Sequence, residues 1–167
     1  MDTDKIIQGK KILIVDDEKD ILDTLYELLD NCKLDTAQTF EDGKKMLEEN
    51  YYDVAILDIM GVSGFELLDI AKQKGVPALM LTAHGLSEEN LKRSAEEGAA
   101  YYAPKEEMAN IGTFVADVIE SRDKKRNAWT KWYDRLGTFY DKRFNGTDWR
   151  EKSDEFWKKK LKEYTGI

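Results

Sequence analysis

The chain has little of what marks disulfide-bonded, secreted or membrane proteins. Among its 167 residues there is one cysteine, Cys32, which excludes an internal disulfide and favours a reducing compartment. No apolar run approaches the roughly 20 residues that a bilayer-spanning helix needs. Residues 1–5 are acidic and carry no hydrophobic signal region, so we expect a cytoplasmic protein.

Histidine is as scarce as cysteine, because His84 is the only one. A metal site built from imidazole and thiolate ligands therefore lacks the residues that it would need. Acidic residues, in contrast, are abundant, with 34 Asp and Glu against 26 Lys and Arg. A metal site in this chain is expected to use oxygen ligands, which suit a hard cation such as Mg²⁺.

Two apolar runs in the sequence end abruptly on carboxylates. Residues 11–15 are followed by Asp16, Asp17 and Glu18, and residues 53–57 are followed by Asp58. Short runs of Val, Ile and Leu are typical of strands buried in a parallel sheet, and ligands bind beyond the carboxyl ends of such strands. If the two strands are neighbours, their carboxylates converge and would repel one another unless they share a cation. Such a pocket suits phosphoryl transfer onto an aspartate.

Strand-like and helix-like segments alternate along the rest of the chain. Residues 34–40, 79–83 and 99–102 have the composition of strands, whereas residues 20–30, 41–50, 65–72 and 87–98 have helical spacing or helix-end signals. This alternation predicts an α/β fold with a parallel sheet, right-handed crossovers and helices on both faces.

Four groups of residues at the strand ends occur in a defined order. They are Asp16 with Asp17, then Asp58, then Thr82 and Ala83, and finally Lys105 after the fifth strand. In this order and spacing, residues 11–120 resemble the receiver domain of two-component response regulators. The resemblance implies a flavodoxin-like, doubly wound, five-stranded sheet in the order 2-1-3-4-5. We divide the chain into an N-terminal tail (1–10), a receiver domain (11–122) and a basic, aromatic-rich helical extension (123–167).

The resemblance also implies the chemistry of the acidic residues. Asp58 would be the phosphoacceptor, attacking the phosphohistidine of a histidine kinase or phosphotransfer protein. Asp17 would bind Mg²⁺ directly and Asp16 would act through a water, while Asp58 and the backbone carbonyl of Met60 would complete the protein ligands. Such a protein is not a conventional enzyme, because it catalyses only its own phosphorylation and dephosphorylation.

Three further residues take family roles, each with a plainer alternative. Lys105 would pair with the phosphoryl oxygens, and Thr82 would donate its hydroxyl to one of them and move inward on phosphorylation. Tyr102 occupies the aromatic switch position and would swing from exposed to buried. Taken singly, these residues are better explained as a solvated cation, a strand residue and a core aromatic, but their occurrence together and in family order favours the functional roles. His84 is either at the rim of the pocket or a half-exposed loop residue.

The sequence departs from the family pattern in two loops. The loop after Asp58 has no proline and reaches Gly64 after six positions, where Gly61 would supply backbone freedom. After Lys105 the family usually has a cis-proline, but here Pro104 precedes the lysine and Glu106 follows it. Either the peptide bond between Lys105 and Glu106 is a strained cis bond, or the loop reaches the pocket differently. We favour the cis bond, because the lysine must still point at Asp58.

The charge of the chain divides near residue 120. Residues 1–120 hold 12 Lys and Arg against 26 Asp and Glu, giving −14, whereas residues 121–167 hold 14 against 8, giving +6. All four tryptophans lie in the second part, and its apolar residues recur at helical spacing. Two helices are expected, the first from Trp129 to Phe144 and the second carrying Trp149, with Thr147 or Asp148 as its cap.

Three uses of the extension remain open at this point. Its aromatic residues can pack on the receiver, on a partner protein or on a second copy. Basic residues interleaved with aromatics can bind nucleic acid, and the same composition can lie at a membrane surface. The expected function is accordingly a response regulator that switches interaction with a partner; the alternative is a transcription regulator with a minimal basic output segment.

Overall fold

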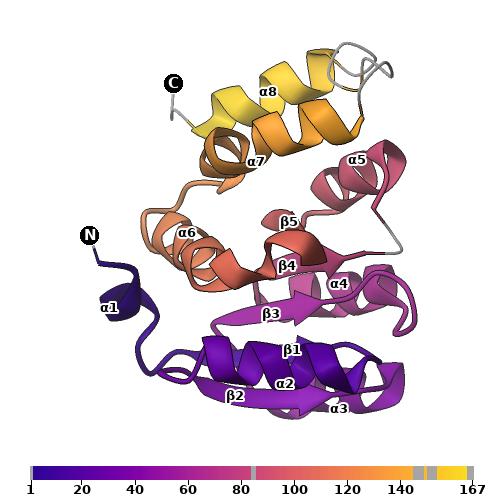
Figure 1. The fold of residues 1–167 in the computed structure, drawn as a ribbon, viewed down its shortest axis with the longest axis vertical. Coiled ribbons are helices and arrows are strands. Elements are labelled where there is room, and N and C mark those ends of the chain that lie inside the picture. Colours follow the sequence, from indigo (N-terminus) through magenta and orange to yellow (C-terminus); the bar gives the residue numbers. More distant parts are fainter. Residues whose placement is uncertain (1, 84–85, 145–148, 150–153, 165–167) are drawn as a thin grey trace.

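Five parallel strands form one sheet in the order β2-β1-β3-β4-β5, as predicted (Figure 1). The computed structural model describes residues 2–83, 86–144, 149 and 154–164. Strands β1, β3 and β4 lie inside the sheet and are almost entirely buried, which agrees with their runs of apolar residues. The strands are β1 (Lys11–Val15), β2 (Lys33–Ala37), β3 (Val54–Leu57), β4 (Ala78–Thr82) and β5 (Tyr101–Pro104).

Helices cover both faces of this sheet. Helices α2 and α6 contact each other over one face, and α3 and α4 contact each other over the opposite face (Figure 1). Thr39 caps α3 and Ser87 caps α5, each accepting a hydrogen bond from a backbone N–H three residues later. The helices of this part are α2 (Lys19–Leu28), α3 (Phe40–Glu49), α4 (Gly64–Gln73), α5 (Glu88–Glu96) and α6 (Ile111–Asp123), with a 3₁₀ helix at Lys105–Asn110.

The N-terminal segment holds more structure than the word tail implies. Helix α1 (Thr3–Ile7) is capped by the Asp2 carboxylate, which accepts a hydrogen bond from the backbone N–H of Asp4. It packs against α6, where Ile7 is buried. The fifth strand also begins two residues later than expected, because residues 99 and 100 form the entry to β5.

The extension is helical and packs on the rest of the chain. Helix α7 (Trp129–Arg143) lies against β5 and α6, and α8 (Asp154–Tyr164) lies on α7 (Figure 1). Trp149 itself has turn geometry and does not belong to the second helix, because α8 begins only at Asp154. The expected caps Thr147 and Asp148 lie outside the described residues. No helix in the described ranges is long and apolar enough to cross a membrane.

Candidate functional site

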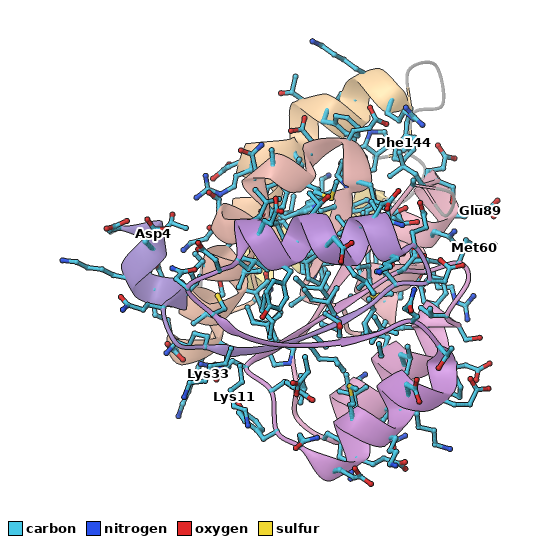
Figure 2. The ribbon with its side chains drawn as sticks, turned by 60° about the horizontal axis from the view of Figure 1, so that its bottom comes forward. Asp4, Lys11, Lys33, Met60, Glu89 and Phe144 are labelled. Carbon is cyan, nitrogen blue, oxygen red and sulfur yellow. The ribbon has the colours of Figure 1, made fainter. Side chains whose placement is uncertain are left out.

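The acidic residues lie at the carboxyl edge of the sheet. Val15 of β1 pairs in register with Leu57 of β3, so Asp16 and Asp58 follow neighbouring strands and point into the same region. Met60 lies at this edge, whereas Lys11 and Lys33 mark the opposite edge (Figure 2). Asp16 and Asp58 are only 2% and 5% exposed, which is unusual for carboxylates. Buried carboxylates of this kind need a positive charge nearby to offset the loss of hydration.

Lys105 provides that compensating charge. Its Nζ lies 2.8 Å from Asp16 Oδ2, 3.0 Å from Glu18 Oε1 and 3.7 Å from Asp58 Oδ1. The lysine follows β5 directly and begins the 3₁₀ helix. Every peptide bond among the described residues is trans, so the expected cis bond between Lys105 and Glu106 is wrong. A trans chain turning at once into the 3₁₀ helix already directs the lysine into the pocket, and no strained bond is required.

The protonation of this group of side chains is strongly perturbed. Burial raises the pKa of Asp58 to about 7; the Asp16 carboxylate adds to the rise and the Lys105 ammonium opposes it. Burial likewise raises the pKa of Asp16. Burial acts to lower the pKa of Lys105, but its hydrogen bonds to Asp16 and Glu18 outweigh this and raise it. Asp58 is therefore a carboxylate whose charged form would gain from a nearby cation.

Three consecutive carboxylates fit such a cation. Oxygen atoms of Asp16, Asp17 and Glu18 come within 4.8 Å of one another, with Asp16 buried and the other two exposed. An all-oxygen set with exposed members suits Mg²⁺, which retains water in its coordination shell. Glu18 was not among the predicted ligands, although its position as the third member of the acidic run was a visible signal.

Two glycines shape the loop beyond Asp58. Gly61 has a φ of +84°, and a Cβ at this position would lie 2.6 Å from Asp17 Oδ2. A Cβ on Gly64 would lie 2.2 Å from the backbone oxygen of Asp58. Both distances are much shorter than a van der Waals contact. The loop can therefore pack this closely on Asp17 and Asp58 only because Gly61 and Gly64 have no Cβ. The loop after Asp58, which is shorter than the family usually has, thus lies against the acidic residues. The role of the Met60 carbonyl as a metal ligand stays a prediction.

Thr82 and Tyr102 lie on the neighbouring strands β4 and β5. Thr82 ends β4 and is fully buried, in register with Pro104 of β5. Tyr102 is also fully buried, so the structure has it in the inward position. Its hydroxyl accepts a hydrogen bond from the backbone N–H of Ser87 at 3.2 Å, at the start of α5. The predicted rim residue, His84, lies outside the described residues.

The extension meets this part of the chain at Tyr102. The backbone carbonyl of Tyr102 accepts hydrogen bonds from Trp132 Nε1 at 2.7 Å and from the Tyr140 hydroxyl at 3.0 Å. The rings of Tyr102 and Tyr140 lie 5.8 Å apart. Tyr102 therefore contacts both the start of α5 and the aromatic face of α7, a connection that the spacing of the aromatic residues alone did not predict.

Comparisons with known proteins agree with this geometry. Residues 12–113 match the response regulator receiver domain family. The chain is 42% identical over 83 residues to the regulatory protein VanRc of Enterococcus gallinarum, covering 46% of this chain and 36% of that protein. It is 35% identical over 118 residues to the two-component response regulator ARR18 of Arabidopsis thaliana, covering 65% of this chain and 18% of that one.

A solved structure gives the same result for the fold. The CheY-like receiver domain protein of Methanospirillum hungatei superimposes with a TM-score of 0.64 at 27% identity, covering 71% of this chain and 99% of that one. The chain spans well under half the length of the two curated relatives named above, so the similarity concerns their receiver parts. The protein belongs to the response regulator receiver family of two-component signalling.

Proposed function

We propose that Asp58 accepts a phosphoryl group from the phosphohistidine of a histidine kinase or a phosphotransfer protein. A carboxylate oxygen attacks phosphorus, the P–N bond to histidine breaks, and an acyl phosphate forms on Asp58. The observation that carries the proposal is the position of this buried carboxylate, 3.7 Å from Lys105 Nζ and beside Asp16. Phosphoryl transfer depends mainly on positioning and on electrostatic stabilisation, and both are available here.

Receiver domains generally bind Mg²⁺ at an acidic pocket, and this chain has the residues for it. Asp17 and Asp16 would hold the ion, with the Met60 carbonyl and Glu18 as further oxygen donors. When bound, the ion neutralises charge on the carboxylates and on the incoming phosphoryl group. In our proposal Lys105 then exchanges its contacts with Asp16 and Glu18 for the phosphoryl oxygens, and Thr82 supplies a hydroxyl to the same group.

The output proposed here is a change in how the extension docks. Movement of Thr82 or of the segment leading to Ser87 would disturb the hydroxyl contact of Tyr102, and the carbonyl of Tyr102 holds Trp132 and Tyr140. Phosphorylation would thereby alter the α7 face and expose or hide a surface for a partner protein or a second copy. We place this activity in the cytoplasm, where a histidine kinase would supply the phosphoryl group.

Burial and charge pairing favour this use of the extension over nucleic-acid or membrane binding. All four tryptophans are buried, so they do not offer rings for stacking on bases or for insertion into lipid. Several basic residues already pair with acidic residues of the receiver: Lys131 Nζ lies 2.6 Å from Glu120 Oε1, and Arg143 Nη1 lies 3.1 Å from Glu106 Oε1. A titration with duplex DNA at two salt concentrations separates the alternatives, since a minimal output segment would bind and weaken steeply with salt.

The chemical nature of the adduct tests the proposal. The protein is incubated with radiolabelled acetyl phosphate with and without Mg²⁺, and the product is treated with hydroxylamine. We expect label only with Mg²⁺, and its release by hydroxylamine, because an acyl phosphate reacts with this nucleophile and a serine or threonine ester does not. The matched control is Asp69→Asn. Asp69 is an exposed residue of α4 that accepts a hydrogen bond from Gln73, and this variant should be labelled like the unmodified chain. Label that resists hydroxylamine would contradict the proposal.

A further inference from the structure

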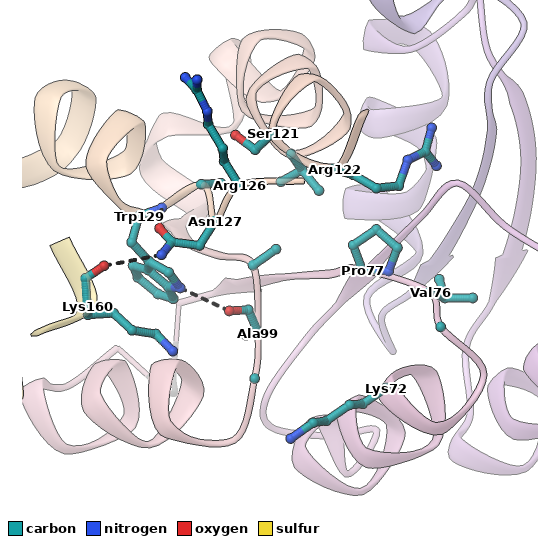
Figure 3. A pocket seen from close by; sticks show the side chains of 15 residues that line it. Lys72, Val76, Pro77, Ala99, Ser121, Arg122, Arg126, Asn127, Trp129 and Lys160 are labelled. Carbon is teal, nitrogen blue, oxygen red and sulfur yellow. Dashed lines mark hydrogen bonds between the residues drawn. The ribbon is translucent and has the colours of Figure 1, made fainter. Parts of the chain in front are cut away.

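A cavity of about 370 Å³ lies between the receiver and the extension, far from Asp58 (Figure 3). It opens at the edge of the sheet where β4 and β5 begin, lined there by Pro77 and Ala99. Lys72 of α4 forms part of the receiver wall, whereas Asn127 and Lys160 belong to the extension. A molecule bound in this cavity would therefore touch both parts of the chain.

The walls of the cavity carry positive charge without a compensating carboxylate. Lys72, Arg122, Arg126 and Lys160 line it, and no Asp or Glu does so among the described residues. The guanidinium of Arg122 is already engaged, because its Nη1 lies 2.9 Å from Asp53 Oδ1. Across the described part of the chain, no carboxylate comes within 4.0 Å of the other three cations. The guanidinium of Arg126 extends away from Lys72 and Lys160 (Figure 3), so the two lysines are the charges available to an anion in the cavity.

The remaining lining has two useful properties. The hydroxyl of Ser121, a residue only 4% exposed, has no hydrogen-bond partner among the described residues, and a buried hydroxyl left in this state costs free energy. Val76, Pro77 and Val118 give the cavity an apolar wall. The site therefore combines charge and a hydrogen-bonding group with a surface for hydrocarbon, as small-molecule sites do.

The extension is fastened to the receiver at this same place. Trp129 Nε1 donates a hydrogen bond to the carbonyl of Ala99 at 3.1 Å, which joins the extension to the receiver (Figure 3). Within the extension, Asn127 Nδ2 donates one to the carbonyl of Lys160 at 3.2 Å and so ties α8 to the segment before α7 (Figure 3). Lys72 and Lys160 extend from different walls, one on α4 and the other on α8 (Figure 3). Neutralising both lysines with one anion would remove their mutual repulsion and link α4 to α8.

We propose that this cavity binds a small organic phosphate. The phosphate dianion lies between Lys72 and Lys160, and the organic part contacts Val76, Pro77 and Val118. A single inorganic phosphate would leave most of a 370 Å³ cavity unfilled and the apolar wall unused, so the phosphomonoester is the better match. Because the ligand contacts both parts of the chain, its binding favours the docked extension and is favoured by it.

The extension reports binding directly, since all four tryptophans lie in it and Trp129 lines the cavity. Phenyl phosphate and inorganic phosphate are titrated separately into the full chain in EDTA, with tryptophan fluorescence as the readout and calorimetry as a second measurement. We expect phenyl phosphate to bind more tightly than inorganic phosphate. Repeating the titration on Asp58→Asn, where we expect an unchanged dissociation constant, separates the cavity from the phosphorylation pocket.

Charge variants locate the binding. The double variant Lys72→Gln/Lys160→Gln should weaken phenyl phosphate binding by about tenfold or more, since two charge-assisted contacts are lost. Lys74→Gln/Lys159→Gln changes two neighbouring lysines that do not line the cavity and should bind like the unmodified chain. Circular dichroism is used to check that both variants are folded.

The outcomes divide cleanly. Binding that survives in the first double variant, or that is lost equally in both, would overturn the assignment of the site. Equal affinity for phenyl phosphate and inorganic phosphate would refute the claim that the apolar wall binds an organic group. If neither probe bound, the whole proposal would be refuted. A second expected result is slower proteolysis of residues 124–128 with phenyl phosphate present; an unchanged rate would refute the link between binding and docking.

Discussion

Replacing Trp132 tests whether the extension is part of the folded unit. Its side chain is fully buried; it stacks on Trp157 at a ring distance of 5.6 Å and on Tyr140 at 5.4 Å, and its indole N–H bonds the carbonyl of Tyr102. Truncating a buried aromatic to alanine costs about 3–5 kcal/mol. The Tyr102 carbonyl keeps its bond from the Tyr140 hydroxyl, so no large penalty for an unpaired acceptor is added.

Urea unfolding followed by far-ultraviolet circular dichroism measures this cost without relying on tryptophan fluorescence. We expect Trp132→Ala to lose about 3–5 kcal/mol, and Trp132→Phe to lose a smaller part, about 1–2 kcal/mol, because a ring remains while the hydrogen bond is lost. Tyr26→Ala is the control, since Tyr26 is 59% exposed and should change stability by less than about 0.5 kcal/mol. A loss below about 1 kcal/mol for Trp132→Ala would show that the aromatic packing does not hold the extension in place.

Three further predictions concern the acidic pocket and its loop. In EDTA, Asp58→Asn should stabilise the chain at pH 7.5 by up to about 4 kcal/mol: the pKa of Asp58 is near 7 when folded and near 4 when unfolded, so the native protein loses stability as pH rises between these values. The gain should vanish at pH 4, and thermal melts that show the same gain at both pH values would contradict it. Asp17→Ala should weaken Mg²⁺ binding more than Asp16→Ala, because a direct ligand is lost; calorimetry giving unchanged affinity for Asp17→Ala would count against the metal site. Gly64→Ala should cost about 2–3 kcal/mol or more, since its Cβ would meet the Asp58 carbonyl at 2.2 Å, whereas Gly112→Ala, with no contact nearer than 3.6 Å, should be neutral or stabilising in a urea titration.

The core of the fold was predictable because each strand has its own signal. Strands buried in a parallel sheet need nearly continuous apolar residues: β1 and β3 are rich in Val, Ile and Leu, and β4 has Ala, Leu and Met before its final Thr82. Strand ends were less certain. Residues 99 and 100 resemble a strand in composition but form the entry to β5, because the pairing with β4 begins at Tyr101. Trp149 was placed in a helix by its spacing, although the chain turns there before α8 begins.

The site was predictable in its residues but not in all of its contacts. The order of Asp16, Asp58 and Lys105 along the chain anticipates their convergence, because strand ends of a parallel sheet meet at one edge. The expected cis bond after Lys105 is wrong, because the sequence does not show that the chain enters a 3₁₀ helix there, from which the long lysine side chain reaches the pocket with a trans bond. Burial of the extension on β5 was one of several alternatives, because aromatic and basic composition fits packing, nucleic acid and membranes alike.

The central claim is that the phosphoryl group is carried by Asp58. Intact-mass measurement after incubation with acetyl phosphate and Mg²⁺ tests it most directly, applied in parallel to the unmodified chain and to Asp58→Asn, with Asp69→Asn as control. The account predicts one phosphoryl adduct per chain for the unmodified protein and for Asp69→Asn, and none for Asp58→Asn. The same adduct on Asp58→Asn would contradict it.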